Sequence, residues 1–472
     1  MRFTSVDFER NVTKALQDEH LQDALQRGMH GFVGKRAEAV AAVPEFERLR
    51  DEAREIKNHT LEHLDYYLES FEESVVRSGG HVHWAVDAVE ARGIVLDICR
   101  KTGAKSITKG KSMAGEEIDL NEALEAEGFE VVETDLGEYI IQLANEPPSH
   151  IIAPAVHKTR EQVSDLFHHH HRLLGFEQRQ VEVPALVDEA RQVLRKKFLQ
   201  ADVGITGANF LIAETGSNVI VTNEGNGDLT STLPRVHVVT AGIEKVVPTL
   251  EDMTVLMRVL ARSATGQEAS TYTTIFSGPR RPGDADGPEE FHVVLIDSGR
   301  TAILGTEFQD ILRCIRCGAC LNHCPVWGAV GGHAYGWCYS GPMGAVLTPL
   351  LKDLEAAKHL PNACTLNGRC EQNCPVRIPL PGLLRKLRHR QYEANLTGAT
   401  TRYGLHVWAF LAKRPALYDF CCNVVVRLLH LLGKRRGRLA RVPLAGGWTR
   451  GRDLPAPAGA TFQSQWRARG RS

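Results

Sequence analysis

Eight of the eleven cysteines lie between positions 314 and 374, and four of them fall within eleven residues. This first motif reads C-x2-C-x2-C-x3-C, with Cys314, Cys317, Cys320 and Cys324, and a proline follows it. Three thiolates on one tight loop can reach three irons of a cubane, and a fourth on the next helix points to a neighbouring cluster. A zinc site usually takes two close cysteines and a distant pair, which fits this spacing poorly. The motif therefore predicts iron–sulfur ligation.

A second motif begins at Cys364 and continues with Cys370 and Cys374 before another proline. The first motif has the spacing of a bacterial two-cluster ferredoxin, and at its second place the second motif has Asn367. The pseudo-two-fold rule of such modules pairs the motifs crosswise. The expected ligands are Cys314, Cys317, Cys320 and Cys374 for cluster one, and Cys324, Cys364 and Cys370 for cluster two.

Cluster two is then one thiolate short. A water, Asn367 or another thiol could complete it, and the alternative is a three-iron cluster or an iron that is open to substrate. Cys338, in the segment GGHAYGWCYSGPMG between the motifs, could supply the thiol, although a small buried cysteine also packs well in a core. The cysteines therefore predict two [4Fe-4S] clusters, with the fourth ligand of the second left open.

The elements that must position these motifs differ along the chain. Residues 1–77 have apolar side chains at spacings near three and four, which predicts two or more helices. Residues 78–297 alternate short β-branched runs with helical stretches, which predicts an α/β domain with a largely parallel sheet. The polar segment Ser277–Glu290 is rich in turn residues and predicts a surface loop before the last strand. The expected strands are Ser106–Thr108, Glu130–Glu133, Val219–Thr222, Val236–Thr240 and His292–Ile296.

Short helices are expected in the cysteine region, residues 298–395, because Gly and Pro interrupt it often. Residues 396–472 form a basic C-terminal region. Tyr403–Leu432 is an apolar helical stretch broken around Pro415, and the tail from Leu444 has the composition of a disordered segment.

Charge is distributed unevenly. The chain has a net charge of -1, but residues 381–472 hold 18 Lys and Arg against 3 Asp and Glu. A basic end of this kind could lie on an anionic membrane near a quinone pool, dock on an acidic partner, or simply cap the fold. Nucleic acid is not expected as a partner, because no helix-turn-helix or zinc finger accompanies the arginines.

Two polar loops of the α/β region are candidates for a ligand pocket. Lys109, Lys111 and Ser112 follow a short strand and precede a helix, where backbone N–H groups can hold an anion. The alternative is a solvated loop in which Ser112 caps the helix. A second set flanks another strand and could form a pocket at the sheet edge, or could simply make tight turns. Its members are Glu214, Asn223 and Glu224.

Length and composition set the wider limits. A chain of 472 residues with 43% hydrophobic and 24% charged residues predicts two or three globular domains. The N-terminus has no apolar signal segment, and no run of 18 apolar residues occurs, so we expect a cytoplasmic protein without a spanning helix. Cysteines stay reduced in that compartment, which favours metal ligands over disulfides.

Longer segments resemble a known family. The runs IRCGACLNHCPVWGAVGGHAYG and CPVRIPL are similar to the LutB-type family of lactate-utilisation iron–sulfur proteins. KGKSMAGEEIDLNEAL and GANFLIAETGSNVIVTNEGNGDL resemble the LUD domain of that family. The resemblance covers roughly residues 10–440 in the same order. It implies an NagB/RpiA-like α/β LUD domain, then a helical two-cluster ferredoxin-type domain, with helical extensions at both ends.

The resemblance also implies a function. The chain would be the electron-transfer component of an L-lactate dehydrogenase complex that forms pyruvate, beside a cysteine-rich LutA-like protein and a separate LUD-domain protein. It would lie in the cytoplasm or at the inner face of the membrane. The alternative is that the LUD domain is itself a catalytic or ligand-sensing unit and that the clusters are structural or regulatory. The second motif of this chain departs from the family pattern at one position, because the family usually has a cysteine where Asn367 stands. Cys364, three residues earlier, keeps the number of cysteines in this motif at three.

Overall fold

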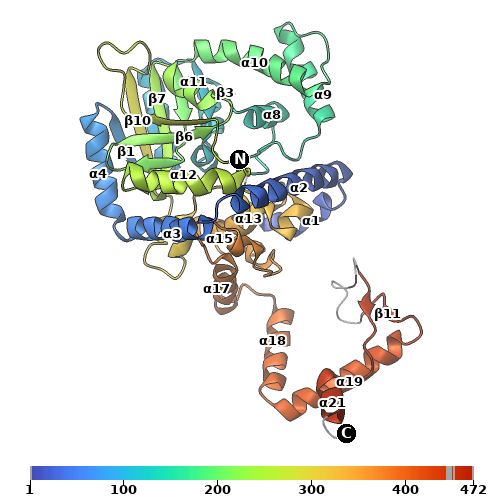
Figure 1. Ribbon diagram of the computed structural model, residues 1–472. Coiled ribbons are helices and arrows are strands. Elements are labelled where there is room, and N and C mark those ends of the chain that lie inside the picture. The colour runs from blue at the N-terminus through green and yellow to red at the C-terminus, as the bar shows by residue number, and fades with distance from the viewer. Residues whose placement is uncertain (1–2, 443–448, 450–451, 470–472) are drawn as a thin grey trace. The chain divides into compact units, whose positions relative to one another are not determined.

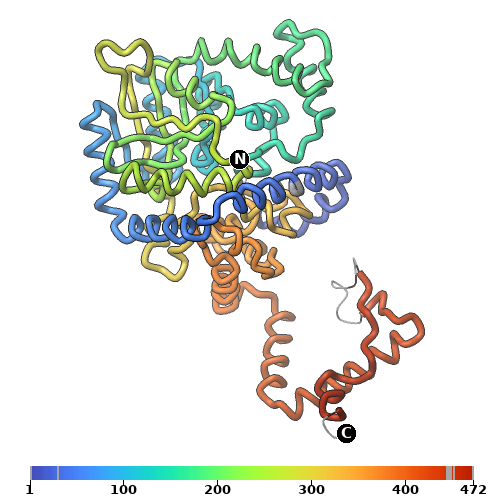
Figure 2. The backbone as a smooth tube through the Cα atoms, viewed as in Figure 1, coloured from blue at the N-terminus to red at the C-terminus, as the bar shows by residue number. Residues whose placement is uncertain are grey.

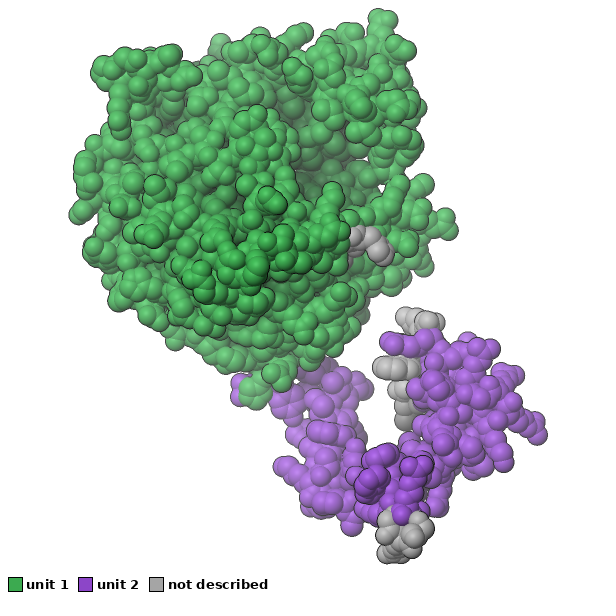
Figure 3. Space-filling view, viewed as in Figure 1, with its two compact units in different colours: residues 1–391 green, residues 392–472 purple. Residues whose placement is uncertain are grey.

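The computed structural model describes residues 3–442, 449 and 452–469, apart from the side chains at positions 29 and 30. The chain divides into two compact units, residues 1–391 and 392–472 (Figure 3). The first unit contains the two larger sheets and both cysteine motifs, and the second contains a two-stranded sheet and the basic C-terminal region.

The N-terminal segment is helical, as its periodicity predicts. Its elements are η1 (Ser5–Asp7), α1 (Phe8–Ala15), α2 (Glu19–Ala41), α3 (Phe46–Glu62) and α4 (Leu64–Arg77). The apolar stripe of α3 buries Phe46, Leu49 and Ala53, and the same face also buries Arg50 and Lys57. Helical spacing of three and four places these two cations on the stripe.

A six-stranded parallel sheet forms the centre of the α/β domain (Figure 1). Its strands follow the order β1-β10-β7-β4-β2-β3. Their bounds are β1 (His81–Ala85), β2 (Ser106–Gly110), β3 (Glu130–Glu133), β4 (Val203–Thr206), β7 (Val236–Gly242) and β10 (Glu290–Ile296). Every residue of β7 is buried, as expected for a parallel sheet covered on both faces. The prediction of a parallel α/β domain is confirmed, and the loop before β10 lies where the turn residues predict it.

Helices connect the parallel strands, and apolar cores lie on both faces of the sheet. On β7, Val236 and Val238 belong to one core, and Val239 and Ala241 belong to the other. The connecting elements are α5 (Ala88–Lys101), α6 (Met113–Glu117), α7 (Leu120–Ala126), α8 (Leu136–Ala144), α9 (Arg160–His171), η2 (Arg172–Leu174), α10 (Val183–Gln200), α11 (Asn226–Thr232), η3 (Ile243–Lys245) and α12 (Leu250–Ala264).

A second sheet takes strands from the same region, in the order β8-β5-β6-β9. Its members are β5 (Phe210–Ile212), β6 (Ser217–Thr222), β8 (Val246–Val247) and β9 (Tyr272–Phe276). The expected strand at 219–222 therefore forms, but outside the parallel sheet. A turn of only four residues joins β5 to β6, and so short a connection allows antiparallel pairing only.

The cysteine region consists of short helices, as predicted. They are η4 (Gln309–Arg313), α13 (Ala319–Asn322), α14 (Pro325–Val330), η5 (His333–Tyr335), α15 (Gly341–Leu351), η6 (Leu360–Asn362), α16 (Arg369–Gln372) and α17 (Leu380–Glu393). Helices α2 and α3 pack against this region (Figures 1 and 2). Phe46 of α3, Leu256 of α12 and Trp327 of α14 share one apolar core. The N-terminal helices, the α/β domain and the cysteine motifs are therefore one packed body.

The second unit begins with two apolar helices, α18 (Ala399–Ala412) and α19 (Pro415–Gly433). The predicted break is confirmed, with Pro415 in the first turn of α19, where a missing N–H costs nothing. By length and composition α19 could cross a membrane, and it is hardly buried. One helix of this length and composition does not show a membrane span, so the expectation of no spanning segment stays a prediction. Asp419 and Arg427 interrupt the apolar run of this helix, but its average hydropathy stays high.

The basic tail is partly ordered. Strands β11 (Arg438–Leu439) and β12 (Leu454–Pro455) pair, and α21 (Phe462–Arg469) follows. The prediction of disorder is therefore wrong over these segments, because the strand pairing and contacts with α19 such as Arg467–Asp419 (2.8 Å) hold them. For residues 443–448, 450–451 and 470–472 the prediction lies outside the described residues.

Candidate functional site

The two cysteine motifs have the same backbone conformation. Arg316 and Leu366 are left-handed, with φ of 58° and 55°, and Gly318 and Gly368 are left-handed at 74° and 81°. A short helix follows each glycine, α13 in the first motif and α16 in the second. The motifs are therefore a structural repeat, in which Asn367 occupies the place of a cysteine.

Four thiols surround one small apolar cavity. They belong to Cys314, Cys317, Cys320 and Cys374, and Met343 and Val376 are among the apolar residues beside them. Burial raises the pKa of Cys317 to about 12, and the neighbouring thiols of Cys374 and Cys314 add to the shift. All eleven cysteines are described, and each is a free thiol. Buried thiols that cannot ionise alone need a cation to become thiolates, so this donor set fits an iron–sulfur cluster.

A second group consists of Cys324, Cys364 and Cys370. Burial raises the pKa of Cys370 to about 12, and the thiols of Cys364 and Cys324 are the next causes. Backbone N–H groups lie within hydrogen-bonding distance of the sulfur atoms, from Trp327 N to Cys324 Sγ (3.4 Å) and from Leu366 N to Cys364 Sγ (3.3 Å). Such contacts tune cluster potentials.

The two candidates for the fourth place behave differently. Asn367 is exposed, and its Oδ1 accepts a hydrogen bond from Arg369 N (3.1 Å), which closes a turn just before α16. Cys338 is buried, and its main electrostatic neighbours are acidic or basic side chains rather than the cysteines of the second group. These neighbours are Glu117, Glu116, Lys352 and Arg316.

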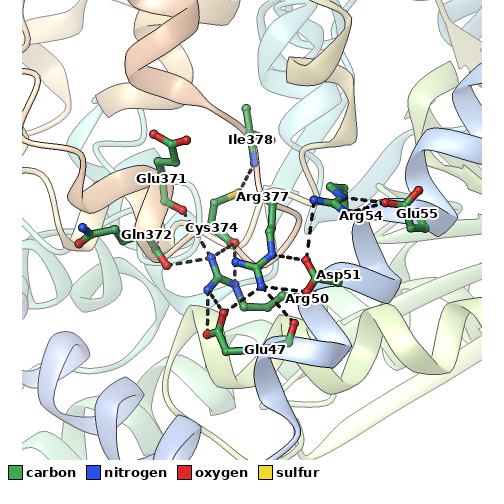
Figure 4. A network of polar contacts seen from close by, with 10 residues as sticks. All are labelled: Glu47, Arg50, Asp51, Arg54, Glu55, Glu371, Gln372, Cys374, Arg377 and Ile378. Carbon is green, nitrogen blue, oxygen red and sulfur yellow. Dashed lines mark hydrogen bonds and ion pairs between the residues drawn. The ribbon is translucent and has the colours of Figure 1, made fainter.

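Helix α3 holds the second motif in place (Figure 4). The buried Arg50 donates to the carbonyl oxygens of Cys374 (2.8 Å) and Gln372 (2.8 Å) and forms an ion pair with Glu47 (2.8 Å). Arg377 forms an ion pair with Asp51 of the same helix (2.6 Å). The carbonyls at the end of α16 have no partner within that helix, so Arg50 satisfies them and fixes Cys374.

A cavity of about 170 Å³ lies where the parallel strands β2, β4 and β7 end. Ligands of open α/β sheets bind at this edge. Residues from the cysteine region, Arg316 and Tyr339, complete the wall. The cavity therefore adjoins the loop that carries Cys314 and Cys317.

Three of the six predicted pocket residues gather at this edge. Lys111 has φ of 57°, and its Nζ contacts Asp135 and lies 3.6 Å from Glu224 Oε2. Asn223 lines the cavity, and its Oδ1 accepts from Gln267 Nε2 (3.1 Å).

The other three have different environments. Ser112 caps α6 through Gly115 N (2.9 Å), as in the alternative of a capped helix, but it is buried and does not lie in a solvated loop. Lys109 is buried against Glu133 (2.6 Å) and Glu116 (2.9 Å). Burial opposes the charge of Lys109, but these carboxylates raise its pKa overall. Glu214 lies at the opposite end of β6 from Asn223 and is exposed.

A buried polar network was not predicted from the sequence. Arg300 donates to Glu117 (2.7 Å) and Glu244 (2.6 Å), and Arg316 donates to Glu244 (3.0 Å). The hydroxyl of Tyr339 donates to Glu117 (2.7 Å). Burial opposes ionisation of Glu244, but Arg300 and Arg316 lower its pKa to about 2. Arg316 could have been noticed, because a cation stands inside a cysteine motif.

A separate cluster contains Glu146, His157 and His333, whose ligand atoms lie within 4.8 Å of one another. Both carboxylate oxygens of Glu146 have partners, His157 (2.7 Å) and Lys158 (2.5 Å). His333 Nε2 lies 2.7 Å from the carbonyl of Pro147. This cluster connects η5 to the segment after α8.

Known families match successive parts of the chain. The LUD domain matches residues 68–296, the 4Fe-4S dicluster domain 310–378, and the C-terminal region of lactate utilisation protein B 387–471. The chain is 46% identical to "Lactate utilization protein B" of Bacillus licheniformis, over 98% of this chain and 97% of that protein. It is 43% identical to the protein of the same name from Bacillus subtilis, over 98% of this chain and 96% of that protein.

A crystal structure of a DUF162 family protein from Deinococcus radiodurans is similar over 49% of this chain and 98% of that one. The sequence identity is 15% and the TM-score 0.28. So low a score carries no argument.

Proposed function

The chain belongs to the lactate utilisation protein B family, and from this premise we propose that it is the electron-transfer component of a complex that oxidises L-lactate to pyruvate. A role in lactate utilisation with iron–sulfur electron transfer follows from the family and from the 4Fe-4S domain. The observation that carries the finer proposal is the gathering of seven cysteines into two groups within one packed body. Clusters bound there would supply single-electron transfer.

The proposed ligand sets are those of the crosswise rule. Cys314, Cys317, Cys320 and Cys374 would hold cluster one, and their shared cavity supports this set. Cys324, Cys364 and Cys370 would hold cluster two, with a water, Asn367 or another thiol in the fourth place, or with only three irons. Arg50 positions Cys374, the cysteine that crosses between the motifs.

The proposed partners are a LutA-like cysteine-rich protein and a separate LUD-domain protein. The exposed apolar residues of α18 and α19 and the basic residues around them support docking of the second unit on a partner or on an anionic membrane surface. We place the protein in the cytoplasm, where the second unit could reach the inner membrane face. The proposed domains remain 1–77, 78–297, 298–395 and 396–472.

The cavity supports a second candidate function. A LUD domain with a pocket at its sheet edge could bind or convert a ligand by itself, while the clusters stabilise or regulate it. Lys111 and Asn223 would then contact that ligand.

Anaerobic purification tests the two functions. Full-length protein should be brown, with about eight iron and eight sulfide per chain. L-lactate should reduce its visible absorption only after the partner proteins are added. Stoichiometric zinc without sulfide would refute the electron-transfer function, and lactate turnover by this chain alone would favour the second function.

A further inference from the structure

The cavity at the sheet edge has two cations that belong to different regions of the chain. Lys245 ends η3, directly after β7, and Arg316 lies between Cys314 and Cys317. The side chain of Arg316 is only 9% exposed. Its left-handed backbone is uncommon for a residue with a side chain.

Two buried carboxylates form ion pairs with two of the cations around this cavity. Glu117 pairs with both terminal nitrogens of Arg300 (2.8 and 2.7 Å), and Glu244 is shared by Arg300 and Arg316. Among the described residues, the acceptor of the Nη1 of Arg316 is a weak one, the sulfur of Met343 (3.7 Å).

The two nearby lysines differ in their partners. Lys57 Nζ donates to the carbonyl oxygens of Glu244 (2.6 Å) and Val246 (3.3 Å). Lys245 Nζ forms no hydrogen bond or ion pair with any residue in the described part of the chain. Burial and the charge of Arg316 lower the pKa of Lys245 to about 8, while Glu244 and Cys314 act in the opposite direction.

The shape of the cavity favours a small ligand. A Cβ at Gly242 would clash with Glu244 and Arg300, and a Cβ at Gly207 would clash with Lys111. Both glycines therefore lie in tightly packed parts of the cavity wall, and about 170 Å³ is below the size of typical drug-sized pockets.

The opposite wall limits the charge of the ligand. Asp135 and Glu138 also line the cavity, and Lys111 neutralises the first of them. Burial and the carboxylates of Glu133 and Asp135 raise the pKa of Glu138 well above its ordinary value. A monoanion meets less repulsion here than a phosphate dianion does.

We propose that Lys245 and Arg316 bind the carboxylate of a small 2-hydroxy or 2-oxo acid, beside the loop that carries Cys314 and Cys317. An ammonium and a planar guanidinium are the usual partners of a carboxylate. The class of acid rests on the function proposed above, whereas the anion site rests on the cavity and its cations.

Binding to the anaerobic full-length protein tests this site. Isothermal titration with L-lactate and with pyruvate should show saturable binding, and the neutral analogue lactamide should not bind. Lys245→Met should weaken binding roughly ten- to hundredfold, because it removes a hydrogen bond to a charged group. Arg316→Lys should weaken it less. Lys196→Met removes an exposed lysine of α10 and should leave affinity unchanged.

A spectroscopic readout separates a binding defect from a folding defect. Iron and sulfide content should be equal in wild type and Lys245→Met. The acid should shift the EPR signal of reduced cluster one in wild type only, because Arg316 shares its loop with two of the proposed ligands.

Each remaining outcome is decisive. Unchanged affinity in Lys245→Met, or no binding to wild type, would overturn the site and leave the electron-transfer function standing. Equal or tighter binding of inorganic phosphate would overturn the carboxylate assignment. Acid binding that depends on Lys245 would support the site. Failure of lactate to reduce the clusters in the reconstituted complex would count against the proposed function alone and would leave the site standing.

Discussion

The two cysteine motifs share one backbone but differ in what surrounds them. At equivalent left-handed positions, the side chain of Arg316 is 9% exposed and paired with Glu244, whereas Leu366 is 36% exposed. Cys317 is buried in the first motif, and its counterpart Asn367 is exposed in the second. The same loop therefore faces the interior in one copy and solvent in the other.

This difference indicates a division of roles. The first motif adjoins the cavity at the sheet edge, so a cluster there would be the one near a bound ligand. The second motif has exposed neighbours on its loop, so a cluster there would be the one accessible to a partner.

The largest expected effect is that of Cys317→Ser. It removes a ligand from the buried site, so iron content should fall from about eight to about four per chain, and lactate-dependent reduction should be lost. The cores on both faces of the parallel sheet contain no cluster cysteine and should keep their circular dichroism. Full iron content in this variant would show that the first motif does not hold a cluster through Cys317.

Arg50→Met should have the next largest effect. It removes the buried guanidinium that donates to the carbonyls of Gln372 and Cys374 and leaves Cys374 O with the bond from Arg377 N (3.2 Å), which should destabilise the first unit by about 2–4 kcal/mol in denaturant unfolding. Under the crosswise rule the variant should destabilise cluster one, although Arg50 contacts the second motif. Arg54→Met changes a more exposed arginine of the same helix and should cost less than about 0.5 kcal/mol.

EPR can separate these possibilities. Preferential loss of the cluster-two signal in Arg50→Met would contradict the crosswise assignment of Cys374. Equal effects of Arg50→Met and Arg54→Met would contradict the role of buried hydrogen bonds at the end of α16.

The sequence predicts the fold well where the pattern is local. The helices of residues 1–77 follow from spacing, and the parallel strands β2, β3, β7 and β10 follow from short β-branched runs. The other two strands of that sheet, β1 and β4, were not among the expected strands. The position of β6 in a second sheet could not be predicted, because pairing depends on which strands meet after folding. The apolar stretch that forms α18 and α19 follows from composition, and the break between the two helices follows from Pro415.

The candidate site is less predictable than the fold. Cysteine spacing identifies the thiols, because cluster geometry imposes it on the sequence. The network of Glu244, Arg300 and Arg316 joins residues 56 and 72 positions apart, and no local pattern marks such contacts. Arg50 and Lys57 are intermediate cases, because helical spacing places them on the apolar stripe of α3 even though their partners are distant.

Cys364→Ser tests whether the more open group binds metal at all. Cys364 is partly exposed, while Cys324 and Cys370 are buried. If it is a ligand of cluster two, the variant should lose up to about four irons and keep the signal of cluster one. Unchanged iron content and spectra would exclude Cys364 as a ligand and would make Cys338 the next candidate.

The smallest effect on stability is expected at Asn367, and it separates the motifs most directly. Asn367→Ala removes the hydrogen bond from Arg369 N to Asn367 Oδ1 just before α16, which should cost about 0.5–1 kcal/mol. Cluster two has three proposed cysteines, so one iron has a weaker ligand and should be lost first. Mild oxidation of wild type should convert cluster two, and not cluster one, to a three-iron form that is visible by EPR without reductant. Asn367→Cys restores the thiol found at the equivalent place in the first motif, so it should suppress that conversion. If cluster one converts first, or if Asn367→Cys has no effect, the exposed motif does not contain the labile iron. The two motifs would then differ in how they are packed and not in how firmly they hold iron.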